Sequence, residues 1–104
     1  PFGIDCSGFT QMVYKINGHK ILRDAKDQAT QGITLSFIEE SEPGDLAFFH
    51  NDKDEIVHVG IILKDNHIIH ASGKVRIDRL DQSGIYNNEK NKHTHSLRYI
   101  KKII

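Results

Sequence analysis

The sequence predicts an α+β domain, in which N-terminal helices pack on an antiparallel sheet of about five strands. Three observations lead to this prediction. Apolar residues recur at helical spacing near the N-terminus, and β-branched runs separated by turn signals follow only later in the chain. Helices that precede strands, rather than alternate with them, are typical of the α+β class. The length of 104 residues fits one domain, 1–104.

The first helix is expected to begin just after Asp5, a residue type that caps helix N-termini. Asn17-Gly18 ends it. The apolar positions that recur at helical spacing are Cys6, Phe9, Val13 and Ile16. A second, weaker helix is predicted from about 23 to 31, with Gly32 as its stop.

The strands are expected to follow a turn signal at 42–45, Glu-Pro-Gly-Asp. A polar, irregular stretch at 72–95 is predicted to be loop. The expected strands are 46–49, 56–63, 67–71 and 96–104.

Cys6 is the only cysteine of the chain, which excludes an internal disulfide and a multi-cysteine zinc site. A thiol in the first turn of a helix meets unpaired backbone N–H groups and the positive end of the helix dipole, and both favour the thiolate. We therefore expect a lowered pKa and a nucleophilic role for Cys6. The alternative is an inert buried thiol that packs as a small apolar residue.

His58 and His70 lie on a predicted β-hairpin, and the length of its turn decides whether they can cooperate. A three-residue turn pairs Leu63 with His67 and places Gly60 opposite His70. His58 then lies diagonal to His70 on the same face, within reach of a long side chain. A two-residue turn would place the two histidines on opposite faces.

These residues together predict a cysteine hydrolase. Cys6 is the nucleophile and its backbone N–H an oxyanion donor, His58 is the base, and His70 orients His58 by accepting from its other ring nitrogen. In the competing interpretation, His58 and His70 are structural residues of their strands, with satisfied hydrogen bonds and no catalytic role. No metal or cofactor is expected, because His93-Thr94-His95 lacks carboxylate or cysteine partners. The remaining histidines are predicted to be loop, exposed or strand-end residues or to point away from His70: His19, His50, His67, His93 and His95.

Charge balance and hydropathy argue against nucleic acid as a general partner and against a membrane span. Fourteen basic and fourteen acidic residues balance, so a general nucleic-acid binder is not expected. No apolar run of about eighteen residues is present, so no membrane span is predicted, and no signal peptide is found. The chain opens with Pro1 and is expected to be the C-terminal part of a longer protein.

Four motifs follow one another along the chain: Asp5-Cys6-Ser7-Gly8-Phe9, Pro43-Gly44-Asp45-Leu46, His58-Val59-Gly60-Ile61 and Ile69-His70-Ala71-Ser72. With these motifs in this order, the sequence resembles the NlpC-type peptidases, papain-like enzymes that trim bacterial cell-wall peptides. The stretch 70–78 is most similar to the subgroup of γ-D-glutamyl-L-diamino acid endopeptidases.

The resemblance implies a papain-like fold, a nucleophile at Cys6, a base at His58 and an orienting residue at His70. It also implies that Asp5 and Ser7 flank a substrate in which L-Ala-γ-D-Glu is joined to diaminopimelate or lysine. The implied location is the bacterial cell envelope, the periplasm or the exterior rather than the cytoplasm. The implied partners are the small murein peptide and upstream domains of the bacterial Src-homology-3 type. The family's Tyr-x-Trp-Gly-Gly segment, which normally precedes this start, is absent here.

Two other functions compete with the peptidase. One is a non-catalytic module that binds cell-wall peptide on the same fold, and the other is a thiol amidase or acyltransferase with a different substrate. The presence of Cys6, His58 and His70 together favours catalysis, because a retired site usually loses at least one such residue.

Overall fold

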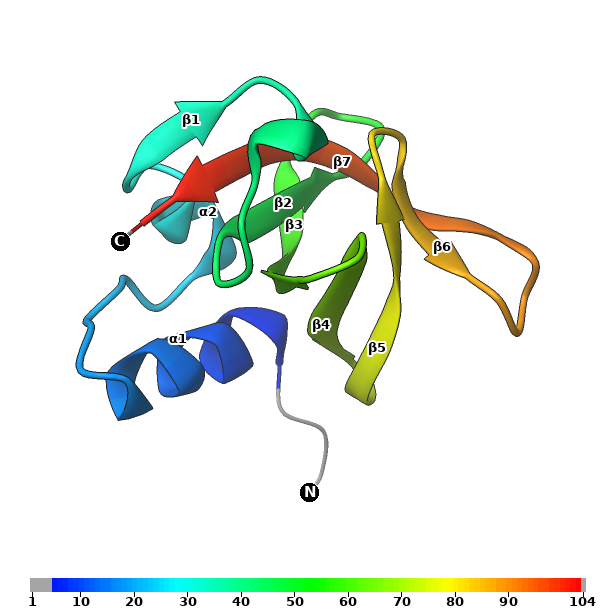
Figure 1. Ribbon diagram of the computed structural model, residues 1–104. Helices are drawn as coiled ribbons and strands as arrows, with labels where there is room; N and C mark the ends of the chain where they lie inside the picture. The colour runs from blue at the N-terminus through cyan, green and yellow to red at the C-terminus, as the bar shows by residue number, and fades with distance from the viewer. Residues whose placement is uncertain (1–4, 104) are drawn as a thin grey trace.

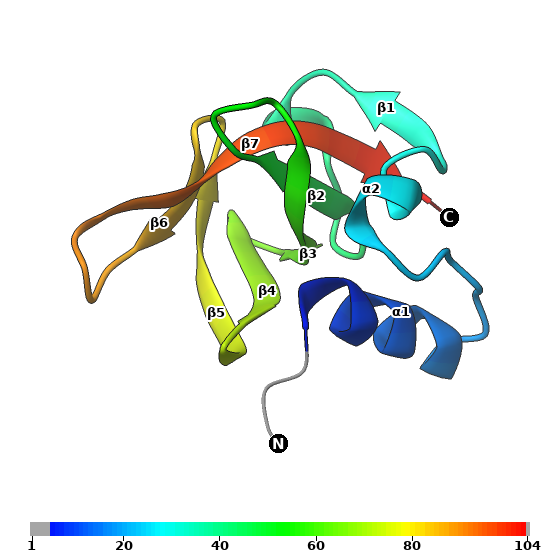
Figure 2. The same ribbon diagram turned by 180° about the vertical axis from the view of Figure 1, so that it is seen from behind.

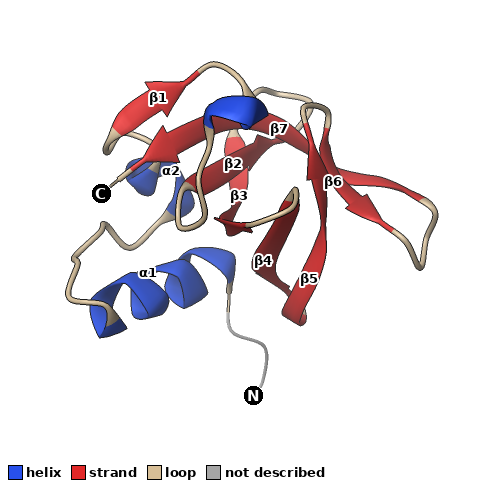
Figure 3. Ribbon diagram, in the orientation of Figure 1, coloured by secondary structure: helices blue, strands red, loops and turns tan. Residues whose placement is uncertain are grey.

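The computed structural model describes residues 5–103 of the chain (Figure 1). Two α-helices and a short 3₁₀ helix come from the first 40 residues, and most of the strands follow (Figure 3). The elements are α1 (Cys6–Ile16), α2 (Ala25–Gln28), β1 (Ile33–Leu35), the 3₁₀ helix η1 (Ile38–Glu40), β2 (Leu46–His50), β3 (Ile56–Leu63), β4 (His67–Ser72), β5 (Lys74–Asp81), β6 (Gly84–Asn87) and β7 (Lys92–Lys102).

The strands form one antiparallel sheet that closes on itself. Its order is β1-β7-β2-β3-β4-β5-β6, and β6 pairs back onto β7, so six strands make a barrel and β1 adds to the edge of β7. Helix α1 lies outside the barrel against β3 and β4 (Figure 2). The α+β class is therefore confirmed, whereas the expected number of about five strands is wrong: residues 5–103 contain seven.

The largest error of the sequence prediction lies in the stretch expected to be loop. Residues 74–81 and 84–87 form β5 and β6, and β7 begins at Lys92 rather than at residue 96. Strand β5 carries charged side chains at most positions and buries a single large apolar one, Leu80, so its apolar alternation is too weak to see. Barrel closure supplies the partner strands that hold these polar segments extended.

The second helix is also shorter than predicted. It spans only Ala25–Gln28 instead of 23–31, and the chain then turns into β1, a strand that the sequence did not indicate. Asp24 precedes the helix in extended conformation but makes no capping hydrogen bond. A single uncapped turn of helix has little stability of its own, so packing rather than propensity fixes its length.

Two apolar cores lie on the two faces of the sheet. The continuous apolar run of β2 serves both, because successive side chains of a strand point to opposite faces. Leu46 and Phe48 face the core beneath α1, and Ala47 and Phe49 face the barrel interior. The sheet is thus buried on both sides at this strand, and α1 is held against its outer face.

The β3–β4 hairpin has the register that the catalytic interpretation requires. Leu63 pairs with His67 and Gly60 with His70, so the turn has three residues. Asp65 and Asn66 of this turn have φ angles of 59° each, a conformation that Asn and Asp adopt more easily than most residues. The register places the His58 and His70 side chains on the same face.

Gly60 leaves room for the side chain of Ile68 and for Cβ of His70, so Gly60→Ala is expected to destabilise the domain. An added Cβ would lie 2.6 Å from Cδ1 of Ile68 and 3.0 Å from Cβ of His70. Overpacking of this kind costs about 1–3 kcal/mol. That cost exceeds the roughly 0.5–1 kcal/mol gained by replacing a strand glycine with alanine. Urea denaturation measures the difference, and a variant as stable as the wild type would contradict the close packing.

Candidate active site

The start of α1 is fixed by its own capping residue. Asp5 has extended backbone and accepts a hydrogen bond of 2.6 Å from the backbone N–H of Gly8. Cys6 is therefore the first helical residue, as the sequence predicts. Its side chain is half-buried and packs against the outer core, which includes Val59 of β3 and Ala71 of β4.

Arg23 joins the two residues that flank the cysteine. Its guanidinium lies 2.7 Å from Oδ2 of Asp5 and donates to Oγ of Ser7 at 3.0 Å. The Asp5 side chain is 60% exposed, so a bound molecule can reach it, whereas Ser7 is buried and its hydroxyl already accepts from Arg23. Sequence reasoning did not select Arg23 as a site residue, and its role follows only from the folded position of the loop after α1.

A buried glutamine holds the same loop from the other side. The Nε2 group of Gln28 donates to the carbonyl oxygens of Ser7 at 3.1 Å and Leu22 at 2.7 Å. Gln28 has no exposed surface. Helix α2 therefore positions the first turn of α1 through a side-chain amide.

The thiol of Cys6 is protonated at rest. Burial raises its pKa, and the negative charge of Asp5 adds to this, while the backbone N–H groups of Val59 and Ser7 act in the opposite direction. The expectation of a lowered pKa is therefore wrong. Loss of hydration outweighs the helix N-terminus, whose positive end is offset by the capping carboxylate.

Alkylation measures the protonation state of Cys6 directly. The thiolate is the form of cysteine that reacts with iodoacetamide. We therefore expect the alkylation rate of Cys6 to rise only at a higher pH than the alkylation rate of an ordinary cysteine does. The loss of Cys6 is followed by mass spectrometry across a pH series, with glutathione treated in parallel. A rate that has already reached its plateau well below pH 8 would show a resting ion pair and contradict the neutral thiol.

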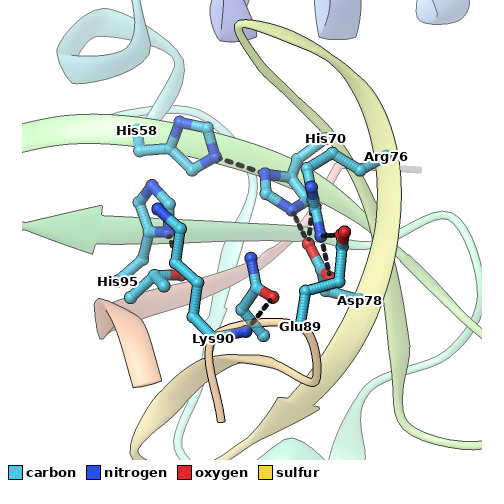
Figure 4. Close-up of polar contacts among 9 residues, drawn as sticks. His58, His70, Arg76, Asp78, Glu89, Lys90 and His95 are labelled. Atoms are coloured by element: carbon cyan, nitrogen blue, oxygen red, sulfur yellow. Dashed lines mark hydrogen bonds and ion pairs between the residues drawn. The ribbon is translucent and has the colours of Figure 1, made fainter. Parts of the chain in front are cut away.

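His58 and His70 are joined by a hydrogen bond inside the barrel. Nε2 of His58 lies 2.8 Å from Nδ1 of His70, and both rings are at least nine-tenths buried (Figure 4). The predicted diagonal contact is confirmed. His58 uses one ring nitrogen for this bond, so its Nδ1 is the nitrogen left for another partner.

A third residue, Asp78 of β5, continues the line of hydrogen bonds. Its Oδ2 lies 2.8 Å from Nε2 of His70. Arg76 grips the same carboxylate with two hydrogen bonds, of 2.9 and 3.1 Å, and also reaches Glu89 at 2.8 Å (Figure 4). Burial acts to raise the pKa of Asp78, but the hydrogen bonds from Arg76 and His70 outweigh it, so the pKa is lowered and the carboxylate is ionised.

His95 covers the base. Its ring stacks on the ring of His58 with centroids 4.2 Å apart and planes at 25°. The prediction that His95 is a loop or exposed residue is therefore wrong, because β7 begins early and pairs His95 with Ile85 of β6. Thr94 contacts the other side of the ring through a 2.9 Å hydrogen bond.

The buried ring of His58 and the half-buried ring of His95 are neutral. Burial, and then the neighbouring His95 and His70, lower the pKa of His58 to about 3. Burial, and then His70, lower the pKa of His95 to about 4. A neutral imidazole has one free lone pair, which is what a general base needs.

The histidines left outside this cluster do not contribute to it. His93 lies against Asp81 at 2.8 Å, on the far end of β5. Within residues 5–103 there is no group of three or more His, Cys, Asp or Glu side chains arranged to hold a metal ion. The helices in this range are all too short or too polar to cross a membrane.

A cysteine at a helix start, packed beside a strand that carries a buried histidine relay, has the parts of a cysteine hydrolase. Comparison with known proteins agrees with this class. The model of the NlpC/P60 family matches residues 1–97, and the chain belongs to the NlpC/P60 family.

Two relatives from Bacillus cereus give the extent of the similarity. The γ-D-glutamyl-L-lysine dipeptidyl-peptidase is 40% identical over 72 residues, which cover 67% of this chain and 21% of that protein. The crystal structure of an NlpC/P60 family protein superposes with a TM-score of 0.77 at 30% identity, covering 97% of this chain and 32% of the other. The chain thus spans about a fifth to a third of the length of these relatives.

The same fold also occurs without catalysis. RipD of Mycobacterium tuberculosis, described as a non-catalytic NlpC/p60 domain protein adapted to peptidoglycan binding, has a TM-score of 0.73 at 20% identity, over 98% of this chain and 68% of that one. At this identity the likeness concerns the fold alone. Activity must therefore be argued from the side chains of this chain.

Proposed function

We propose that this chain is a cysteine peptidase domain that hydrolyses the γ-D-glutamyl–diamino acid bond of murein peptides. The observation that carries the proposal is the hydrogen bond between His58 of β3 and His70 of β4, two strands that α1 contacts, with the only cysteine of the chain at the start of that helix. A nucleophile, a base and an orienting group are the three parts that covalent acyl transfer needs.

In the first half of the reaction the peptide is cleaved and the enzyme is acylated. The Cys6 thiol gives its proton to Nδ1 of His58 while its sulfur attacks the γ-carbonyl carbon of D-glutamate. The backbone N–H of Cys6 is positioned to stabilise the oxyanion. His58 then passes the proton to the leaving amine, the C–N bond breaks, and a thioester remains on Cys6.

In the second half, water releases the acyl group. His58 takes a proton from the attacking water, the carbon–sulfur bond breaks, and the proton returns to the thiolate. Throughout, Nε2–H of His58 donates to Nδ1 of His70, which keeps the ring in place and leaves Nδ1 of His58 to move protons. The neutral resting forms of both Cys6 and His58 mean that the proton moves during the attack.

The choice of substrate has three supports. The stretch 70–78 resembles the γ-D-glutamyl-L-diamino acid subgroup, and a relative 40% identical to this chain is named a γ-D-glutamyl-L-lysine dipeptidyl-peptidase. The exposed Asp5 carboxylate suits the free ammonium group of the L-Ala residue, because a charge-assisted pair there would hold a short peptide at its N-terminus. Ser7 supports this site through Arg23.

The setting of the whole protein is part of the proposal. Relatives of this family include proteins named probable endopeptidases p60 and NlpC. We propose that this chain acts in the cell envelope or outside the cell, because its proposed substrate comes from the bacterial cell wall. Upstream domains of the bacterial Src-homology-3 type would limit the length of the bound peptide.

A non-catalytic module that binds cell-wall peptide on the same fold is the second candidate. Incubation of the full-length protein with L-Ala-γ-D-Glu-diaminopimelate, and with the lysine analogue, separates the candidates. Release of L-Ala-γ-D-Glu and the free diamino acid supports the peptidase. Binding of the peptide without release would establish the binding module. Cleavage only of other amides or esters would indicate a different thiol hydrolase or acyltransferase.

A further inference from the structure

A buried carboxylate lies behind the two histidines, and the reaction scheme above gives it no task. We propose that Asp78 is a positioning residue that sets the tautomer of His70, and through it the tautomer of His58. The inference rests on the proposed function, because it explains which nitrogen of His58 is free to act as the base.

Asp78 is ionised in the folded protein. Arg76 donates to both of its oxygens, at 2.9 and 3.1 Å, in a two-point grip that only an ionised carboxylate accepts fully. An ionised carboxylate is an acceptor only. Nε2 of His70, 2.8 Å from Oδ2 of Asp78, must therefore carry a hydrogen and donate it.

The next step follows from the neutral state of His70. Its ring is 1% exposed, and burial lowers its pKa even though Asp78 acts in the opposite direction. A neutral imidazole has one N–H and one lone pair. With the hydrogen at Nε2, the lone pair lies on Nδ1, 2.8 Å from Nε2 of His58.

The last step assigns the hydrogen of His58. Nε2 of His58 must donate to the lone pair of His70, so the single hydrogen of the neutral His58 ring lies on Nε2. Nδ1 of His58 then keeps its lone pair and can accept the thiol proton. The opposite assignment would leave Asp78 without a hydrogen from His70, and it would put the hydrogen of His58 on the nitrogen that must act as the base.

Arg76 keeps the Asp78 carboxylate ionised, so that Asp78 can only accept a hydrogen bond from His70. Its guanidinium also lies 2.8 Å from the exposed carboxylate of Glu89, so it contacts two carboxylates at once. Each residue positions the next in the order Glu89, Arg76, Asp78, His70 and His58. In the proposed mechanism, Glu89, Arg76 and Asp78 do not touch the reacting atoms.

The test reads the ring nitrogens directly. ¹⁵N NMR of histidine-labelled protein distinguishes protonated from unprotonated nitrogens in the wild type, in Asp78→Asn and in Asp81→Asn. Asp81 is a matched control, because it lies on the same strand and also contacts a histidine at 2.8 Å, but that histidine is His93, outside the relay. Hydrolysis of L-Ala-γ-D-Glu-diaminopimelate is measured for all three proteins.

In the wild type we expect Nε2–H on both His58 and His70. Asp78→Asn should mix the tautomers of both rings and lower kcat about 10- to 100-fold with little change in KM. This loss is smaller than the roughly 10⁴-fold loss seen when a carboxylate in direct contact with the base is replaced, because here an imidazole stands between them. Asp81→Asn should leave the ring-nitrogen signals of His58 and His70 unchanged and the rate within about twofold of the wild type, since the histidine that it contacts, His93, is not in the relay.

A wild-type His70 with its hydrogen on Nδ1 would overturn the proposal even if Asp78→Asn fails to fold. Unchanged ring tautomers in a folded Asp78→Asn protein would also overturn it, because Asp78 would then be only a structural ion-pair partner. A wild-type protein that cleaves no murein peptide would refute the proposed function instead, and the tautomers of the resting rings would still be measured independently.

Discussion

Replacement of Cys6 by serine is expected to abolish hydrolysis of the murein peptide, with kcat/KM lowered by at least about 10³-fold. Serine has nearly the same shape, so the helix start and the cap by Asp5 should remain. A hydroxyl is a far weaker nucleophile than a thiol, and His58 would have to deprotonate a much weaker acid. Release of the diamino acid measures activity, and circular dichroism checks the fold.

The serine variant also separates catalysis from binding. Calorimetry should show that the variant binds the intact peptide with a Kd close to the KM of the wild type, because Asp5 and Arg23 are unchanged. A folded Cys6→Ser protein that still released product at more than a few per cent of the wild-type rate would remove the covalent mechanism.

Replacement of the two histidines is expected to have unequal effects. His58→Ala should reduce turnover to the background rate, because it removes the imidazole that the proposed mechanism assigns to take the thiol proton. His70→Asn or His70→Gln should retain a measurable fraction, since the side-chain carbonyl oxygen can still accept from Nε2–H of His58. Steady-state kinetics of the three variants measures the difference.

His67→Ala is the matched control for these substitutions. His67 lies on the same strand as His70, three residues away and on the opposite face, where it pairs with Leu63. Its removal should leave kcat/KM within about twofold of the wild type. Complete and equal loss in the His58 and His70 variants would contradict the separate roles of base and orienting group.

The parts of the fold that the sequence predicts well are those specified locally. Asp5 and the apolar spacing define α1, and the β-branched run with its three-residue turn defines the β3–β4 hairpin to within one residue. Strands β5 and β6 and the start of β7 escape prediction because their stability comes from closure of the barrel. Charged residues on β5 hide the alternation that would have indicated a strand.

The residues of the candidate site also fall into those that the local sequence predicts and those that it does not. The contact between His58 and His70 follows from one turn, and the sequence therefore predicts it. Asp78 and His95 join the cluster only when β5 and β7 are in place, so nothing local indicates them. The raised pKa of Cys6 was missed because helix position alone does not reveal how much water the folded chain removes.

Catalysis in the proposed mechanism depends on one proton transfer, from the sulfur of Cys6 to Nδ1 of His58. A crystal structure of the full-length protein with L-Ala-γ-D-Glu bound tests it most directly. We predict that Sγ of Cys6 and Nδ1 of His58 lie within hydrogen-bond reach or share one bridging water, with the γ-carboxylate of the product at the backbone N–H of Cys6. A bound product with the thiol and Nδ1 facing different sides of β3, too far apart for one water to join, would contradict the account.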